Sequence, residues 1–240
     1  MIDLHSHILP GLDDGAATLD ESLEIGRAAA ADGIRVVAAT PHVRDDFPTK
    51  PAEAKAALED VRGALAEAGV ELDVIPGGEI ALDWVGRLGI RDLRRFSLGG
   101  GGRYLLVETP YFGWPLGLVN AVLALRRRGL VMVLAHPERN PEVWRRPELL
   151  EEVVAAGALV QLTAASLDGR LGRRVSRAAF ALLDAGHVHL LASDAHAPGL
   201  REAGLSAARA RVGDDAVGRW LTEDVPAAIL AGSELPARPA

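Results

Sequence analysis

The sequence contains no cysteine. This absence excludes disulfide bonds, thiolate metal ligands and every mechanism that uses a cysteine nucleophile. Any reactive centre therefore has to be built from other side chains.

Two further features are missing from the sequence. No apolar run approaches the roughly 18 residues needed to span a bilayer, and the first residues lack the basic and apolar regions of a signal peptide. We therefore expect a cytoplasmic protein without membrane insertion.

An excess of basic residues is also missing: the formal net charge is −7, and lysine occurs only at Lys50 and Lys55. This balance disfavours a nonspecific nucleic-acid-binding protein, because the phosphate backbone attracts basic surfaces.

Short apolar runs alternate with alanine-rich stretches of helical periodicity along the whole chain. With 240 residues and 49% hydrophobic content, we expect a single domain over residues 1–240, with a flexible tail at about 232–240. The predicted strands are IDLH, IRVVAAT, ELDVIPG, RYLLVE, LVMVLAH, ALVQLTA and HVHLLAS. The predicted helices cover residues 20–32, 52–68, 115–128, 147–156, 172–185, 200–211 and 215–230. This pattern predicts an α/β fold, a (β/α)7 barrel with parallel strands and outer helices.

Histidines and carboxylates follow the predicted strands. In a parallel barrel, the carboxyl ends of the strands form one edge, where catalytic groups collect. The residues at or just after these ends are His5, His7, His42, Glu79, Glu108, His136, Asp194 and His196. One such histidine alone is commonly a hydrogen-bonded loop residue, but several in register predict a shared site.

The opening stretch MIDLHSHILPGLDDGA places two histidines and two aspartates at the same edge. Alternation along an extended segment lets His5 and His7 point the same way and bind one ion. Either Asp13 or Asp14 joins them. Imidazole and carboxylate ligands without thiolate suit zinc, manganese or iron, and their number predicts two or three divalent ions.

Two histidines and an aromatic segment fall elsewhere. His187 and His189 begin the last predicted strand, so we expect them at the opposite end of the barrel, in structural roles. Tyr111, Phe112 and Trp114 follow Glu108 and predict an aromatic wall beside the site.

The ordered motifs HSH, TPH, Glu108, AHPER and SDAH resemble the polymerase and histidinol phosphatase (PHP) superfamily. The longer segments HSHILPGLDDGA, ATPHV, GGEIAL, AHPERN, TAASLDGRLGRR and SDAH, followed by Arg201, resemble the bacterial metal-dependent protein-tyrosine phosphatases of capsule and exopolysaccharide loci. The resemblance spans nearly the whole chain. It implies a distorted barrel of the PHP type with a trinuclear metal centre.

The resemblance also implies a role for each matching residue. One metal is implied to bind His5, His7, Glu79 and Asp194; a second, bridged by Glu79, to bind Glu108 and His136; and a third to bind Asp14, His42 and His196. Arg139 and Arg201 match arginines that grip phosphate. Ala197, Glu202 and Phe47 depart from the residues usual in the family and concern the shape of the substrate mouth.

The implied function is hydrolysis of phosphotyrosine in protein, with manganese as the expected metal, or iron or zinc. A metal-bound hydroxide is expected to attack phosphorus directly, because a bound divalent ion lowers the pKa of water from 15.7 to about 7. The implied partner is a phosphotyrosine protein, the tail of a membrane-associated bacterial tyrosine kinase.

Other functions on a similar scaffold are histidinol-phosphate phosphatase, nuclease or amidohydrolase activity, and a non-catalytic PHP-like scaffold. Amidohydrolases commonly use a carboxylated lysine as the bridging ligand, but Lys50 and Lys55 lie away from the strand ends. A scaffold is expected to have lost ligands, and none of the implied set is missing.

Overall fold

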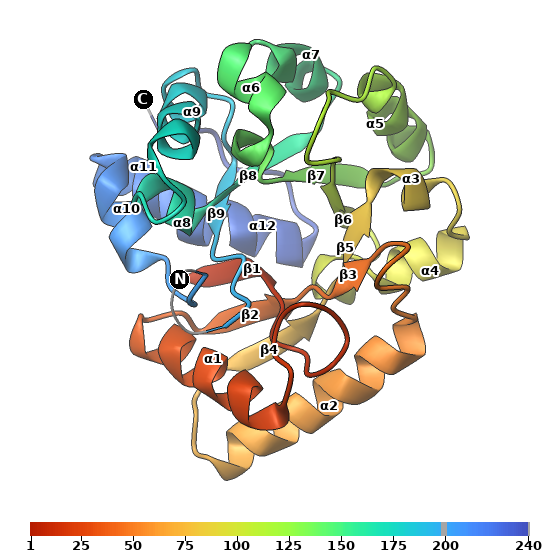
Figure 1. The fold of residues 1–240 in the computed structure, drawn as a ribbon, viewed down its shortest axis with the longest axis vertical. Helices are drawn as coiled ribbons and strands as arrows, with labels where there is room; N and C mark the ends of the chain where they lie inside the picture. Colours follow the sequence, from red (N-terminus) through yellow and green to blue (C-terminus); the bar gives the residue numbers. More distant parts are fainter. Residues whose placement is uncertain (198–200, 240) are drawn as a thin grey trace.

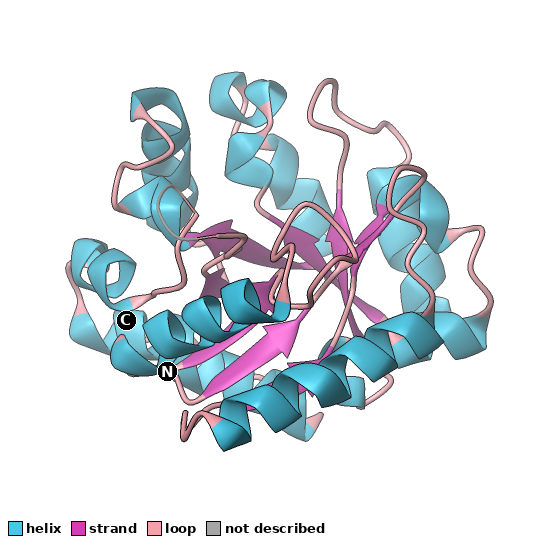
Figure 2. Ribbon diagram, turned by 60° about the horizontal axis from the view of Figure 1, so that its bottom comes forward, coloured by secondary structure: helices cyan, strands magenta, loops and turns pink. Residues whose placement is uncertain are grey.

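Short parallel strands lie at the centre of the molecule, with helices around them (Figures 1 and 2). The computed structural model describes residues 1–197 and 201–239. All strand pairs between named strands are parallel. The predicted α/β class with parallel strands is therefore confirmed.

The described strands form two sheets. Their order is β1-β2-β4 in the smaller sheet and β3-β5-β6-β7-β8-β9 in the larger one. The strands are β1 (Ile2–Ser6), β2 (Val36–Ala39), β3 (His42–Val43), β4 (Asp73–Pro76), β5 (Glu79–Ala81), β6 (Tyr104–Glu108), β7 (Val131–Ala135), β8 (Leu159–Thr163) and β9 (Leu190–Ala192). All seven predicted strands are present, but two of them are interrupted and continue in the other sheet.

The interruptions lie between β2 and β3 and between β4 and β5. The sequence predicted that His42 and Glu79 lie at the carboxyl ends of single strands. Instead, His42 begins β3 and Glu79 begins β5, the short strands that follow the interruptions. Gly77 and Gly78 allow the chain to pass close to its neighbours at this point, because a Cβ atom there would lie 2.9 Å from Thr40 and 2.6 Å from Phe96. The two sheets therefore meet where the carboxylate and imidazole groups are needed.

Hydrogen bonds connect the first strand with the segment after the last one. The backbone N–H of His7 donates to Ala195 at 2.8 Å, and that of Asp194 donates to His5 at 2.9 Å. The buried carboxylate of Asp3 accepts bonds from the N–H and hydroxyl of Ser193. Together with the two sheets, these contacts give a barrel-like arrangement of parallel strands, but the described strands do not form one closed sheet, so closure of the predicted (β/α)7 barrel stays a prediction.

The helices cover the outside of the sheets. The longer ones are α1 (Leu19–Ala31), α2 (Pro51–Glu67), α5 (Leu118–Arg127), α7 (Leu149–Ala155), α9 (Arg173–Asp184), α10 (Ser206–Val212) and α12 (Val225–Ala231). The shorter ones are α3 (Leu82–Val85), α4 (Ile90–Arg95), α6 (Pro141–Arg145), α8 (Ala164–Leu167) and α11 (Asp215–Arg219). None of the helices in the described ranges has the length and apolar character needed to cross a bilayer.

Most helix predictions match an observed helix to within a few residues. The predicted helix over 200–211 begins later, at Ser206, and residue 200 lies outside the described residues. The predicted helix over 215–230 is divided by a π-helical turn, Trp220–Asp224. Helices α3, α4, α6 and α8 were not predicted, because four to six residues are too few to show a helical period. The extent of the domain and the flexible tail stay predictions.

Candidate metal centre

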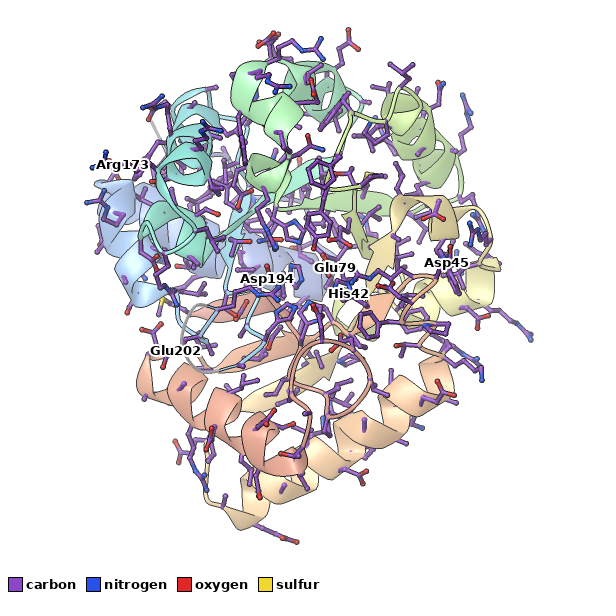
Figure 3. The ribbon with its side chains drawn as sticks, viewed as in Figure 1. His42, Asp45, Glu79, Arg173, Asp194 and Glu202 are labelled. Atoms are coloured by element: carbon purple, nitrogen blue, oxygen red, sulfur yellow. The ribbon has the colours of Figure 1, made fainter. Side chains whose placement is uncertain are left out.

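Nine side chains from distant parts of the chain converge at the carboxyl-end edge of the strands. Figure 3 shows three of them, His42, Glu79 and Asp194, near one another in the middle of the molecule. These side chains form four overlapping groups, and within each group the ligand atoms lie within 4.8 Å of one another. We call the full set the ligand cluster: His5, His7, Asp14, His42, Glu79, Glu108, His136, Asp194 and His196. Every predicted metal-ligating residue therefore lies in it.

His5 and His7 point the same way from the end of β1, as their alternation predicted. Their Nε2 atoms lie 3.2 Å apart. The opposite nitrogen of each ring has its own partner: Nδ1 of His5 faces the amide oxygen of Gln161 at 3.0 Å, and Nδ1 of His7 faces Asp13 at 2.6 Å. If both Nδ1 atoms carry the proton, both Nε2 lone pairs face the same space, which is the arrangement of two ligands of one ion.

Glu79 is the central carboxylate of the ligand cluster. Its Oε1 atom lies 2.8 Å from Nε2 of His136, and its Oε2 atom lies 2.9 Å from Nδ1 of His42 and 3.4 Å from Nε2 of His5. One oxygen thus faces each side of the cluster, as a bridging ligand requires. Glu108 groups with His42 and Glu79, whereas His136 groups with His5 and Glu79. The assignment of Glu108 and His136 to one ion stays a prediction.

A third part of the ligand cluster lies at the loop after β1. Oδ1 of Asp14 is 3.3 Å from Nε2 of His42 and 3.2 Å from Nε2 of His196. His7 joins these three residues in one group. The side chain of Asp14 is 41% exposed, so this part is the one that solvent or a substrate can reach.

Asp13 and Asp14 have different surroundings, which the sequence left undecided. The Asp13 carboxylate is buried and accepts bonds from His7 Nδ1, from the backbone N–H of His42 at 2.8 Å and from that of Gly15 at 2.9 Å. These bonds use its oxygens outside the ligand cluster. Asp13 therefore orients His7, and Asp14 is the aspartate that faces the shared space.

The charges in the ligand cluster shift the pKa values of its members. Burial lowers the pKa of His5, but Glu79 and Asp194 outweigh burial and raise that pKa to about 9. Burial raises the pKa of Asp194, but nearby cations, led by His5, lower it to about 2. The directions of these shifts indicate that the clustered carboxylates favour positive charge beside them, and divalent ions supply such charge in a metal site.

Several buried atoms of the ligand cluster lack a hydrogen-bond partner among the described residues. They are Nδ1 of His42, Oε2 of Glu79, Oε1 of Glu108 and Nε2 of His196. Nδ1 of His42 lies 2.9 Å from Oε2 of Glu79, and Nε2 of His196 lies 3.2 Å from Oδ1 of Asp14, but neither contact has the geometry of a hydrogen bond. A buried polar atom without a partner costs about 1–3 kcal/mol. Because all four residues belong to the groups whose ligand atoms lie close together, and all are ligand-forming residue types, they fit a site for divalent metal ions.

Two arginines lie beside the ligand cluster. Arg139 donates to Oδ2 of Asp194 at 2.6 Å, and its guanidinium lies over the ring of Tyr111 at 5.5 Å. Arg201 lies 3.6 Å from Asp14 and 3.9 Å from Asp194. Both predicted arginines are thus placed where they can contact an anion held at the cluster.

Other residues near the opening of the site were not predicted, or only in part. Arg44 lies 3.3 Å from Glu108 and over the ring of Phe47, which itself stacks on His42 with ring centres 5.9 Å apart. Of the predicted aromatic wall, Tyr111 lies against Arg139 beside the site, Phe112 is 84% exposed, and Trp114 packs against the hydrophobic core. Arg44 follows His42 by two residues in an extended segment, and this spacing was the available signal.

Two residues behind the ligand cluster also carry a signal in the sequence. Gln161 is fully buried in the middle of the apolar strand β8 and holds His5. Glu138 is fully buried, and its Oε1 accepts from the N–H of Thr163 at 2.9 Å and the hydroxyl of Ser166 at 2.7 Å. A polar residue inside an apolar strand, or inside a short histidine-containing motif, indicates such a supporting role.

The chain resembles proteins that act on phosphotyrosine. The family model described as "Capsular polysaccharide synthesis, CpsB/CapC" matches residues 1–229. The tyrosine-protein phosphatase YwqE of Bacillus subtilis is 36% identical over 197 residues, covering 82% of this chain and 77% of YwqE. The tyrosine-protein phosphatase CpsB of Streptococcus agalactiae is 26% identical over 205 residues, covering 82% of this chain and 83% of CpsB.

A solved structure gives the same result for the fold. It comes from crystal structures of YwqE from Bacillus subtilis and CpsB from Streptococcus pneumoniae, described as metal-dependent tyrosine phosphatases. It superposes with a TM-score of 0.88 at 33% sequence identity, covering 100% of this chain and 99% of that one.

Proposed function

Because this chain belongs to the CpsB/CapC family of capsular polysaccharide synthesis proteins, we propose that it is a metal-dependent protein-tyrosine phosphatase, a phosphoric monoester hydrolase. The observation that carries the proposal is the ligand cluster, in which imidazoles and carboxylates face one space beside two arginines. Thiol chemistry is excluded, because the chain has no cysteine.

We assign the nine residues of the ligand cluster as metal ligands for two or three divalent ions, manganese first, with iron or zinc as the other candidates. When bound, such ions lower the pKa of water and polarise phosphoryl oxygens. Glu79 is the bridging ligand in this assignment. Asp13 and Gln161 hold His7 and His5 in the orientation that ligation requires.

The arginines bind the phosphate in the proposed reaction. A guanidinium offers paired N–H donors that match two phosphate oxygens, and Arg139 and Arg201 approach the ligand cluster from different segments of the chain. Tyr111, beside Arg139, is placed to contact the phenyl ring of the substrate. Burial raises the pKa of Tyr111, and the charge of Glu108 adds to this effect, so its hydroxyl keeps its proton at neutral pH.

The substrate is a phosphotyrosine protein. From the family, we infer that this phosphotyrosine lies in the tail of a membrane-associated bacterial tyrosine kinase and that the reaction takes place in the cytoplasm. Histidinol phosphate is a weaker candidate, because the relatives that cover most of this chain are named tyrosine-protein phosphatases.

The test is hydrolysis of a phosphotyrosine peptide by the purified protein with added manganese. We expect activity, its loss on chelation, its return on adding manganese, and its loss in His136→Ala. Elemental analysis of the active protein should give two to three ions per chain. Activity that survives chelation contradicts the metal mechanism, and faster turnover of histidinol phosphate than of the peptide contradicts the substrate.

A further inference from the structure

A groove with a basic lining lies between helices α6 and α9, next to the loop that carries Arg139. Its volume is about 490 Å³. We call it the basic groove, and the lining residues that matter here are Pro141, Trp144, Arg145, Pro147, Arg174 and Arg177. Prolines and a tryptophan form its apolar part, and three guanidinium groups line it.

The arginines of α9 have no acidic partners. Arg173, Arg174 and Arg177 are exposed, and within the described ranges none of them lies within 4.0 Å of a carboxylate. Elsewhere on the surface, many arginines have such partners, for example Arg87 with Asp45 and Asp83. Three unpaired arginines on one helix are notable in a chain with a net charge of −7.

Two of these arginines also lie where the helix dipole disfavours positive charge. Arg173 and Arg174 open α9, where the positive end of the helix dipole disfavours cations. Helix α1 has Asp20 and Glu21 in its first turn, and α2 has Glu53, as the dipole favours. Helix α9 has no acidic residue there. Helices α5, α10 and α12 also lack an acidic residue in the first turn, but α9 begins with two arginines, whose charge an anionic ligand would offset.

The basic groove is fixed to the phosphate-binding loop. Trp144 donates from Nε1 to the backbone oxygen of Glu138 at 2.5 Å, and the buried Glu138 side chain is held by Thr163 and Ser166. Pro141 follows Arg139 by two residues, so their Cα atoms are separated by at most about 7 Å. A peptide whose phosphotyrosine contacts Arg139 therefore reaches the groove within a few residues.

We propose that the basic groove binds an acidic stretch of the substrate protein beside its phosphotyrosine and thereby selects among substrates. This inference rests on the proposed function. A peptide suits the groove better than a membrane does, because the lining is concave and partly apolar, whereas a bilayer presents a broad surface. Figure 3 shows Arg173, which precedes the lining residue Arg174 at the start of α9, on the outer edge of the molecule.

The experiment compares two phosphotyrosine peptides of equal length, one with glutamates and one with glutamines on both sides of the phosphotyrosine. For the manganese-loaded wild type we expect kcat/KM to be about tenfold higher for the acidic peptide, as two to three exposed ion pairs predict, and less so at high salt. The double variant Arg174→Gln/Arg177→Gln should lose this preference and keep wild-type turnover of p-nitrophenyl phosphate. The matched control Arg127→Gln/Arg128→Gln, which removes two exposed arginines from the end of α5, should keep the preference.

The result that overturns the proposal is an equal kcat/KM of the wild type for both peptides, or a preference that the Arg174/Arg177 variant retains. If, in addition, phosphatidylserine vesicles bind the wild type and not this variant, the surface belongs to a membrane instead. Failure of the proposed function looks different, because the wild type then hydrolyses neither peptide nor p-nitrophenyl phosphate. Fluorescence anisotropy of a labelled acidic peptide with unphosphorylated tyrosine measures binding to the basic groove independently of turnover. Equal affinity of the wild type and the double variant for this peptide also overturns the proposal.

Discussion

The seven histidines of the chain lie in two environments that differ in what their rings face. Five of them join the ligand cluster, where carboxylates lie beside the ring nitrogens. The other two, His187 and His189, precede β9 at the opposite end of the barrel, as predicted. There, Nδ1 of His189 accepts a bond from the backbone N–H of Val160 at 3.1 Å, and its ring lies near Trp220.

The pKa values of His42 and His189 follow this difference. In the ligand cluster, carboxylates outweigh burial and raise the pKa of His42 to about 10, whereas at His196 burial, with the charge of His7, lowers the pKa. At the opposite end, burial lowers the pKa of His189 to about 4, with no carboxylate among the causes that act on it. The direction of the strands thus decides whether a histidine faces a charged, ligand-forming space or packs as a neutral ring.

Replacing Glu79 by glutamine is expected to give the largest effect, because it removes the carboxylate that both sides of the ligand cluster share. A bound metal contributes several kcal/mol to transition-state stabilisation, so kcat/KM for a phosphotyrosine peptide should fall by about a thousandfold. Elemental analysis should show a parallel loss of metal. The control is Glu151→Gln on α7, an exposed carboxylate far from the cluster in sequence. Full metal content and activity in Glu79→Gln contradict its bridging role.

Acid should destabilise the opposite end of the barrel through His189. Its pKa is about 4 when folded and about 6.5 when unfolded, so below pH 6.5 the unfolded chain takes up the proton first. The free energy of unfolding should therefore fall as the pH drops from 6.5 to 4, by about 3 kcal/mol, and change no further through this group below pH 4.

The measurement is urea unfolding of the wild type and of His189→Asn between pH 4 and 8. Asparagine offers an oxygen to the N–H of Val160 but does not titrate, so the difference between the two proteins isolates His189 from other groups, including the nearby His187 and Arg238. Parallel curves for the two proteins would show that His189 is not responsible.

The positions of the two groups of histidines could be predicted from the sequence, because they depend on strand direction. Alternating strands and helices were sufficient to place the predicted ligands at one edge and His187 and His189 at the other, because parallel strands share their direction. The breaks after β2 and β4 were not predicted, since each depends on a close approach of Gly77 or Gly78 to side chains far away in the sequence.

The sequence carried a signal for the supporting role of Gln161 and Glu138, but it did not show which residues the supporting side chains contact. Asp13 and Asp14 are identical neighbours, and only the fold shows that one carboxylate turns to His7 while the other faces His42 and His196. Gln161 pairs with His5 across 156 residues, a separation at which periodicity and spacing carry no information.

Asp13 offers a finer test of the ligand cluster, because it acts through His7. Asp13→Asn should weaken metal binding by 10- to 100-fold (about 1.4–2.7 kcal/mol), the range found when a partner of a metal-ligating histidine is lost. Competition with a fluorescent chelator measures this affinity without relying on catalysis. Gln161→Ala, which frees Nδ1 of His5, should act in the same direction, whereas Asp45→Asn, an exposed aspartate that pairs with Arg87, should change nothing. Unchanged metal affinity in Asp13→Asn assigns that residue to folding alone.

The smallest effect is expected at Arg139 and Arg201, where a lysine keeps the positive charge but removes the planar guanidinium. Lysine keeps the positive charge but loses the paired N–H donors, so Arg139→Lys should lower kcat/KM about tenfold, mainly through KM. Arg201→Lys should cost less, because Arg201 lies farther from the carboxylates of the cluster, at 3.6 and 3.9 Å against 2.6 Å for Arg139. Inhibition by inorganic phosphate provides a second readout, and its constant should rise in the same order. Since neither arginine is a ligand, both variants should retain the metal content of the wild type, in contrast to Glu79→Gln. An equal or larger effect at Arg201 would mean that phosphate is held chiefly on the side of Asp14, the exposed part of the ligand cluster.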